Sequence, residues 1–327
     1  MSSGKILITG GSGFIGTNLV ELYSSQGWDV LNLDQKDPLN PKHSQYYKKC
    51  DVNDRDSLIK LFKDYKPELV VHLGARTDLE GKKVETDYCS NAQGVQNVVD
   101  AVNQAGSVKR ASYASSRMVF KTGNIPKHEW DYSPALVYGE SKVRTEEIVR
   151  AQPKDSVPWV IFRPTSIWGE WFDVPYRDFF MTVNRNRYMH PKGLRIIKSY
   201  GYVGNSVLQI QRYMDAPDEL VAGHAFFVGD YPPIEVLEWS RTIQKELGSR
   251  PIREIPYSVL KSMAIVGDGL KKLGMSQPPL TSFRLSNLTI QLEYDLSRER
   301  AVCGPSKFSM PEGVKRTVDW MKQAKIV

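Results

Sequence analysis

The feature that most constrains this chain is a glycine-rich turn that directly follows its first apolar run. Residues 5–9 have the pattern of a short strand, and the turn after them reads Gly10-Gly11-Ser12-Gly13-Phe14-Ile15-Gly16. Glycines at positions 10, 13 and 16 permit a tight turn, close approach of a ligand to the backbone, and close packing of the next helix on the strand. The free N–H groups of that helix would point at an anion. The pattern therefore predicts a dinucleotide pyrophosphate site at Gly10, Gly13, Phe14, Ile15 and Gly16.

Short β-branched runs alternate with amphipathic segments through the first half of the chain. The predicted strands are 5–9, 29–33, 69–73, 110–114 and 157–162, and the predicted helices are 13–26, 55–65, 91–105 and 141–151. This alternation predicts an α/β protein with a doubly wound parallel sheet. We expect residues 1–168 to form this domain, to which the chain returns around 196–231 with a strand at 225–228. Residues 169–195 and 232–327 are expected to form a smaller, C-terminal substrate-binding lobe.

Composition excludes several classes of protein. The 327 residues include 44 basic and 37 acidic side chains, with 41% hydrophobic residues, as in an ordinary globular enzyme. The basic residues are scattered rather than gathered in one stripe, and the apolar runs are too short to span a bilayer, so we expect neither a nucleic-acid nor a membrane partner. Cys50, Cys89 and Cys303 lie far apart, which indicates no metal site, no disulfide framework and a cytoplasmic location.

Acidic residues at two further strand ends predict contacts to the adenosine half of a dinucleotide. Asp34 ends the second strand, where a carboxylate accepts hydrogen bonds from ribose hydroxyls and repels a 2′-phosphate, so NAD is favoured over NADP. Asp51 and Val52 follow a third strand, where the carboxylate would receive the adenine amino group. The alternative is a solvated turn and helix cap.

The end of the next strand is also assigned to the cofactor. Small residues stand there, where the ligand would lie against the backbone. The assigned residues are Leu73, Gly74, Ala75 and, at the start of the helical segment 91–105, Asn91.

A tyrosine and a lysine lie four residues apart at the start of a helix, and hence on one face of it: Tyr138 and Lys142. A free tyrosine has a pKa of about 10, too high for a base at neutral pH. A nearby lysine cation, together with an oxidised nicotinamide, is expected to lower it, so that Tyr138 takes a proton from a substrate hydroxyl while hydride leaves its carbon. Ser116, with Ser115 as the alternate, is predicted to donate to the developing carbonyl. Turn capping is the alternative for this pair.

Together these residues resemble a known superfamily. The glycine turn, Asp34, the Ser-Ser strand end, the Tyr-x-x-x-Lys pair and the segment 163–169 resemble the extended short-chain dehydrogenases/reductases, and more narrowly the nucleotide-sugar epimerases and their dehydratase and reductase relatives. Segments 294–297 and 311–320 are similar to that family's C-terminal pattern. The resemblance implies a Rossmann-type domain holding NAD and a lobe holding a nucleoside-diphosphate sugar.

The resemblance also implies roles and an assembly. Ser116, Tyr138 and Lys142 would be the catalytic trio, and the helices at 91–105 and 141–151 would form a homodimer. The family's place in surface-polysaccharide precursor synthesis is implied in the same way.

Departures from the family pattern narrow the reaction. Arg117 and Met118 stand where dehydratases place an acidic pair, and where enzymes that epimerise beside the ketone use a cysteine. This favours C4 epimerisation through a transient 4-keto sugar, with an NAD(P)H-dependent 4-keto reductase as the alternative. A non-catalytic NAD-binding regulatory protein and a sterol-type hydroxyl dehydrogenase are further alternatives.

The substrate residues are less closely defined. Lys198 and Arg284 are predicted to contact the diphosphate, with a solvated surface charge as the alternative for each. Three aromatic residues have two interpretations, a stacking wall for base or sugar and ordinary core packing: Trp168, Trp171 and Phe172.

Overall fold

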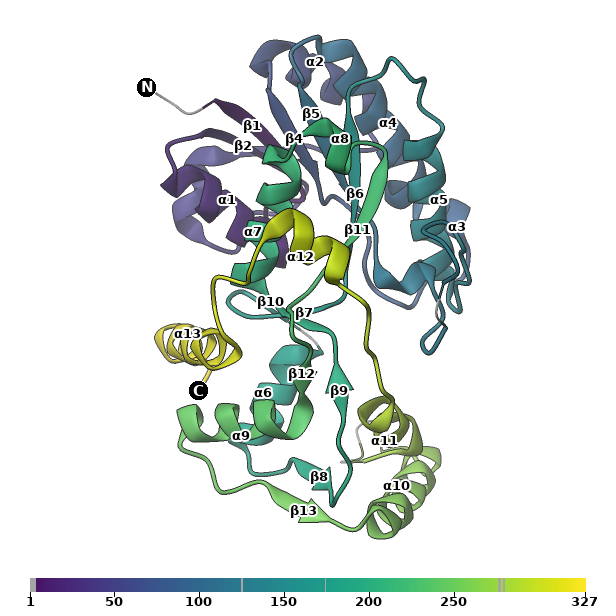
Figure 1. Ribbon diagram of the computed structural model, residues 1–327, viewed down its shortest axis with the longest axis vertical. Coiled ribbons are helices and arrows are strands. Elements are labelled where there is room, and N and C mark those ends of the chain that lie inside the picture. Colours follow the sequence, from purple (N-terminus) through teal and green to yellow (C-terminus); the bar gives the residue numbers. More distant parts are fainter. Residues whose placement is uncertain (1–3, 125, 174, 276–277, 279) are drawn as a thin grey trace.

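A seven-stranded parallel sheet forms the larger part of the computed structural model, which describes residues 4–124, 126–173, 175–275, 278 and 280–327 (Figure 1). Its strand order is β11-β6-β5-β4-β1-β2-β3. The strands are β1 (Lys5–Thr9), β2 (Asp29–Asp34), β3 (Tyr47–Lys49), β4 (Leu69–His72), β5 (Arg110–Ala114), β6 (Trp159–Pro164) and β11 (His224–Val228). Because β1 lies between β2 and β4, the strand order reverses beside it, as in a Rossmann-type doubly wound sheet. The predicted fold class is confirmed.

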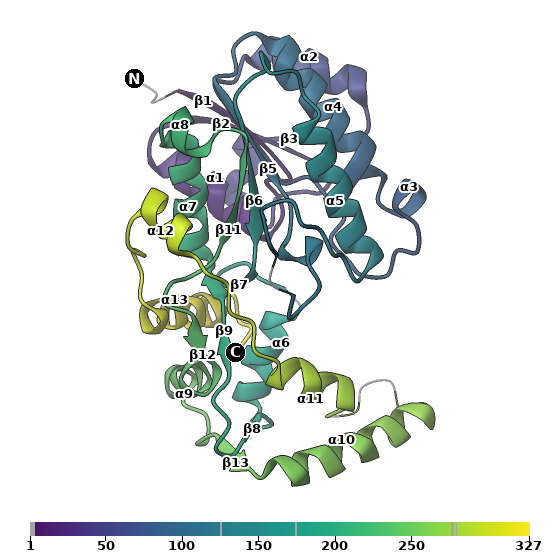
Figure 2. The ribbon, with the colours of Figure 1, turned by 45° about the vertical axis from the view of Figure 1, so that its right-hand side comes forward.

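Helices cover both faces of this sheet. One face carries α2 (Arg55–Tyr65), α4 (Cys89–Ala105) and α5 (Val137–Arg150), and the other carries α1 (Phe14–Ser25) and α7 (Val203–Asp215) (Figures 1 and 2). Successive strand residues point to opposite faces, so Leu7 packs under the first group while Ile6 and Ile8 pack under the second. All three are fully buried, which fixes the register of β1.

The smaller lobe is built from short strand pairs and helices at the carboxyl end of the sheet (Figure 1). Its strand pairs are β7 (Ser166–Trp168) with β10 (Tyr200–Tyr202), β9 (Ile197–Lys198) with β12 (Ile234–Glu235), and β8 (Met189–Pro191) with β13 (Arg253–Ile255). Its helices are α6 (Tyr176–Asn184), α9 (Val236–Leu247), α10 (Tyr257–Lys272), α11 (Ser282–Thr289) and α13 (Met310–Gln323). Trp168 lies at the centre of its core, with its ring centroid 5.4 Å from that of Trp239.

The remaining short helices of the described residues are α3 (Val84–Asp87), α8 (Asp218–Val221), α12 (Ser297–Cys303) and the 3-10 helices η1 (Pro41–Tyr46) and η2 (Arg117–Val119). One of them, α12, departs from the expected division into two parts, because it packs on α7 and β11 of the sheet domain rather than in the lobe. The reason lies in the open edge of the sheet. The Glu299 carboxylate accepts the backbone N–H of Phe227 at 2.8 Å, and the Arg298 guanidinium lies 4.3 Å over the Phe226 ring. An unpaired edge strand thus recruits a segment that is distant in sequence.

Other boundaries differ by a few residues from those expected. The helix that carries Tyr138 begins at Val137 rather than 141, and residues 166–168 leave the main sheet to pair as β7. In the described part of the chain, none of the helices combines the length and apolar character needed to cross a membrane.

Candidate active site

The glycine turn has no room for larger side chains. Gly10 has φ +71°, and a Cβ there would lie 2.6 Å from the Gly74 nitrogen. A Cβ on Gly16 would lie 2.2 Å from the Gly10 oxygen, and one on Gly11 would lie 2.3 Å from Asn32 Oδ1. The backbone therefore forms a cradle that side chains leave open, which fits the pyrophosphate of a dinucleotide.

The first turn of α1 is open to such a ligand. Gly13 is its N-terminal flanking residue and is exposed, while Phe14 and Ile15 are only half-buried. No side chain caps this end of the helix. Its first N–H groups therefore face outward, where an anion would satisfy them.

Asp34 lies at the carboxyl end of β2, beside this turn. Its Oδ2 accepts the Ser12 N–H at 3.1 Å, and its Oδ1 accepts the Lys36 N–H at 3.0 Å. Each oxygen keeps a further lone pair, and the side chain is half-buried beside the glycine turn. The arrangement fits recognition of two ribose hydroxyls.

Asp51 is an exposed turn residue after β3. Its Oδ1 accepts the Asn53 N–H at 2.8 Å, and the cap of α2 is provided by Asp54. Val52 is buried, and its methyl groups lie under Gly74 and Gly94. The alternative of a solvated turn therefore accounts for the conformation of Asp51. Its carboxylate stays exposed to solvent.

Asn91, which the sequence assigns to the cofactor site, holds the loop that follows β4. Its Nδ2 donates to Arg76 O (3.0 Å) and to Ser141 Oγ (2.9 Å), and its Oδ1 accepts the Arg76 N–H (2.9 Å). These bonds use both amide protons of a fully buried side chain. Asn91 thereby joins the loop at Leu73, Gly74 and Ala75 to the start of α5.

Ser116 and Tyr138 meet where β5 ends and α5 begins. Ser116 Oγ accepts the Met118 N–H at 3.1 Å, which leaves its own proton free to donate to the Tyr138 phenol. Both side chains are buried. Lys142 lies one turn further along α5, where its Nζ donates to the backbone oxygen of Ala114 at 3.0 Å. The three predicted catalytic groups are thus gathered at the carboxyl end of the sheet.

The electrostatics of this group differ from the expectation. Burial raises the pKa of Tyr138 to about 12, against which the Ser116 hydrogen bond acts in the lowering direction. Burial also lowers the pKa of Lys142 to about 8, opposed by the charge of Glu146. In the ligand-free protein desolvation therefore outweighs the expected effect of the lysine on the tyrosine, and Tyr138 is a protonated phenol.

The hydroxyl of Ser115, the predicted alternate donor, is engaged by a buried carboxylate. Its hydroxyl donates to Glu146 Oε1 at 2.5 Å. Glu146 is fully buried and forms an ion pair with Arg163. Sequence reasoning missed both charged residues. The available signal was the four-residue spacing from Lys142 to Glu146, which places both on one face of α5.

Two cations lie within range of each other's charge: Arg117, which follows Ser116 in the chain, and Lys198 of the lobe. Lys198 is buried on β9 with its Nζ donating to Asn287 O at 2.9 Å. Burial, together with the nearby charge of Arg117, lowers the pKa of Lys198 to about 8. Neither cation pairs with a carboxylate in the part of the chain that the structure describes. Arg117 is therefore a candidate binding residue that sequence reasoning did not identify.

The other predicted substrate residues lie elsewhere. Arg284 is exposed on α11, and its Nη1 donates to Pro278 O at 2.7 Å. Trp168 and Phe172 are buried in the core, and Trp171 packs on Trp320 with ring centroids 5.5 Å apart. Core packing is therefore the interpretation that the structure bears out for these aromatic residues.

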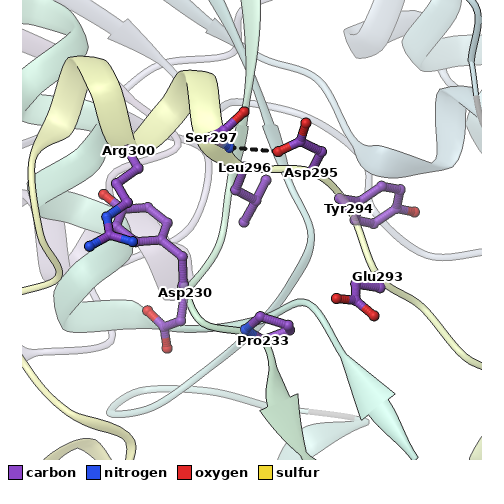
Figure 3. Close-up of a pocket in the computed structure, with 9 residues that line it drawn as sticks. Asp230, Pro233, Glu293, Tyr294, Asp295, Leu296, Ser297 and Arg300 are labelled. Atoms are coloured by element: carbon purple, nitrogen blue, oxygen red, sulfur yellow. Dashed lines mark hydrogen bonds between the residues drawn. The ribbon is translucent and has the colours of Figure 1, made fainter.

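A cavity of about 500 Å³ opens where the sheet domain meets the smaller lobe (Figure 3). Its wall includes none of Ser116, Tyr138 and Lys142. Glu293 and Asp295 contribute carboxylates to this wall, and Arg300 contributes a single cation. The Asp230 carboxylate is held by the Tyr202 N–H (2.8 Å). An excess of acidic groups disfavours phosphate, so this cavity is not assigned to the substrate. Among the described residues, no cluster of His, Cys, Asp and Glu is suited to a metal ion.

Comparisons with known proteins agree with this geometry. A 3 beta-hydroxysteroid dehydrogenase/Delta 5-->4-isomerase of Mycobacterium tuberculosis is 29% identical over 265 residues, which cover 76% of this chain and 70% of that protein. An N-acetyl-alpha-D-glucosaminyl-diphospho-ditrans,octacis-undecaprenol 4-epimerase of Escherichia coli O157:H7 is 25% identical over 97% of this chain and 95% of its own. The crystal structure of a UDP-glucose 4-epimerase from Thermotoga maritima has the same fold, with a TM-score of 0.74 at 18% identity over 98% of this chain and 99% of that one.

A match to a family model covers most of the chain and shows the family to which the chain belongs. Residues 6–229 match the model described as NAD dependent epimerase/dehydratase family, a range that includes the glycine turn, Ser116, Tyr138 and Lys142. The chain therefore belongs to the NAD dependent epimerase/dehydratase family, and it is an enzyme whose cofactor is NAD.

Proposed function

We propose that this enzyme epimerises a nucleoside-diphosphate sugar at C4 through a transient 4-keto sugar. The observation that carries the proposal is a pair of cations, Arg117 next to Ser116 in the chain and Lys198 within range of its charge, neither of which has a carboxylate partner in the described chain. Two uncompensated positive charges in a half-buried site favour an anion such as a diphosphate. A neutral substrate would leave them unpaired, which is costly where water is excluded.

The chain supplies the acid and base groups of the reaction. Tyr138 is the base for the C4 hydroxyl, and Ser116 donates a hydrogen bond to the same oxygen as it gains carbonyl character. Lys142 is held at the strand end by Ala114 O. We propose that its charge favours the phenolate when a proton must be accepted. NAD, when bound, supplies the acceptor that holds the hydride and returns it. The cycle therefore consumes no cofactor.

The decisive experiment is proton NMR of the purified protein with a panel of UDP-, GDP-, CDP- and dTDP-sugars and no added cofactor. A stereoisomer formed in catalytic excess over enzyme is the expected result. Conversion that occurs only with a 4-keto sugar and reduced cofactor would replace the proposal by the 4-keto reductase. A sugar carried on a polyprenyl diphosphate belongs in the panel, because the E. coli relative is named for such a substrate.

The anion site has its own test. Lys198→Met and Arg117→Met are expected to raise the KM for the sugar substrate at least ~10-fold each, since each removes a charged hydrogen-bonding group. Lys192→Met, at an exposed lysine in the same lobe, is the matched control and should leave KM unchanged. Equal KM values for all four proteins would contradict the assignment.

A second candidate is net oxidation of a hydroxyl on a neutral polycyclic substrate. It is favoured by the 29% identity to the mycobacterial hydroxysteroid dehydrogenase, and it would use the same serine, tyrosine and lysine. Accumulation of reduced cofactor in proportion to product, with a 3β-hydroxysteroid as substrate, would support it. An epimerase accumulates no reduced cofactor.

We also propose that the enzyme works in the cytoplasm on precursors of surface polysaccharides, as a homodimer. The proposed dimer interface is formed by α4 and α5, which pack together on one face of the sheet. Sedimentation velocity measures the oligomeric state, and a monomer at micromolar concentration would contradict this part.

A further inference from the structure

An unpartnered apolar stripe runs along α10, the helix that extends outward at the far end of the lobe (Figure 2). Val259, Met263, Val266 and Leu273 are all exposed, up to 62% for Val266 and 85% for Leu273. The spacing of i, i+4 and i+7 places Val259, Met263 and Val266 on one side of the helix, and Leu273 directly follows its last residue. A stripe of this kind would normally be buried, so its exposure needs a partner.

The orientation of α10 is fixed, because another side of the helix is packed against the protein. Leu260 and Ala264 are buried there against Leu285 of α11, and a Cβ on Gly267 would lie 1.8 Å from the Leu280 oxygen. The helix is thus fixed by its own small core, separate from the main one. The second apolar side remains turned outward.

The neighbouring charges are positive. Residues 257–292 contain four basic side chains and one acidic side chain. Lys261, Lys271 and Lys272 are exposed and make no ion pair in the described part of the chain. The acid, Asp268, is occupied by the N–H of Ser282 (3.2 Å) at the start of α11. At helical spacing Lys261 and Lys272 fall on the side of α10 away from the stripe, so the helix carries an apolar side and a separate cationic side.

We propose that α10 docks the enzyme on the surface of a bilayer that contains anionic phospholipids. A helix with one apolar side and lysines on its polar side lies in the plane of the interface, where the apolar groups enter the acyl boundary and the nearby cations attract the anionic headgroups. The expectation that the protein has no membrane partner rested on runs too short to span a bilayer, and a surface-lying helix needs no such run.

The test is co-sedimentation of the full chain with vesicles. One set contains phosphatidylcholine alone and the other contains phosphatidylcholine with phosphatidylglycerol. We expect binding to the anionic vesicles at least ~10-fold stronger than to the neutral ones, weakened by added salt. Lys271→Glu with Lys272→Glu, and separately Val266→Ser with Leu273→Ser, should each weaken anionic binding at least ~10-fold.

Matched controls test whether the loss of any exposed lysine or leucine would weaken vesicle binding equally. Lys60→Glu with Lys63→Glu changes two exposed lysines on α2, at the opposite end of the molecule, and Leu220→Ser changes an exposed leucine on α8. Both should bind as the wild type does. Leu273→Ser alone is the reserve if the double apolar variant does not fold, because Leu273 lies beyond the packed part of α10.

Three results would overturn the proposal. One is failure of the wild type to bind anionic vesicles. Another is equal loss of binding in the control variants. The third is a wild-type dimer that Val266→Ser with Leu273→Ser dissociates, because the stripe would then be buried against a second copy of the chain.

Discussion

Glu146 and Arg163 form a two-pronged ion pair inside the protein, next to the Ser115 hydroxyl. Arg163 Nε donates to Glu146 Oε1 at 2.8 Å and Arg163 Nη2 donates to Oε2 at 2.6 Å, with both side chains at most 3% exposed. Ser115 and Tyr132 fill the remaining positions on the carboxylate. The pair therefore ties α5, which carries Tyr138 and Lys142, to β6 and to the strand end that carries Ser116. We infer that Glu146 is a positioning residue.

Glu146→Gln should lower the free energy of unfolding by about 3–5 kcal/mol, because it leaves the Arg163 charge buried without its partner. The Glu146 charge also raises the pKa of Lys142, so the variant should lose activity at a lower pH on the alkaline side. Urea unfolding and the pH profile of kcat measure the two effects. Glu147→Gln, which alters only an exposed pair with Arg144, should change stability by at most ~0.5 kcal/mol. A variant with wild-type stability and pH profile would show that Glu146 positions nothing.

Tyr138→Phe should retain NAD binding and lose at least ~100-fold in kcat, because it removes the acid/base group while keeping the ring that packs near Tyr88. Steady-state kinetics and an NAD titration give both quantities. Tyr257→Phe, at an exposed tyrosine, is the matched control and should behave as the wild type. Undiminished turnover in Tyr138→Phe would remove this residue from the mechanism.

Asp34→Ala should weaken NAD binding about tenfold relative to NADP, since it removes a charged acceptor of ribose hydroxyls and the group that repels a 2′-phosphate. Titration of the protein with each dinucleotide gives the ratio of dissociation constants. Asp37→Ala, at an exposed aspartate three residues further on, should leave the ratio unchanged. An unchanged ratio in Asp34→Ala is the contrary outcome.

Lys142→Met should abolish activity yet stabilise the ligand-free protein by about 1–3 kcal/mol at pH 7, because burial of the ammonium is unfavourable. The folded-state pKa of about 8 lies below the ordinary 10.5, so the unfolded chain binds more protons between these values. Wild-type stability should therefore rise with pH from about 8 to 10.5, and the advantage of the variant should shrink over that window.

Denaturant unfolding at several pH values measures this difference. Lys60→Met, at an exposed lysine, serves as the control and should show no such pH dependence. A less stable Lys142→Met protein would mean that the Nζ bond to Ala114 O outweighs the unfavourable burial.

Local pattern was enough to predict the sheet domain and the reactive trio. The glycine turn, the strand at 110–114 that leads to Ser116, and the four-residue spacing of Tyr138 and Lys142 all depend on residues close together in the chain. Parallel strands present their carboxyl ends at one edge, so the position of each group along its own segment also gave its place in the site.

Only the tertiary structure decided which distant groups meet. The cations Arg117 and Lys198 lie 81 positions apart, and Arg163 reaches Glu146 from another strand. Partners from other segments occupy the polar atoms of Ser115 and Asn91. The exposure of the apolar side of α10 likewise follows only from the tertiary structure, which shows that α11 packs against a different side of the helix. Such contacts depend on how whole elements pack, which spacing along the chain does not encode.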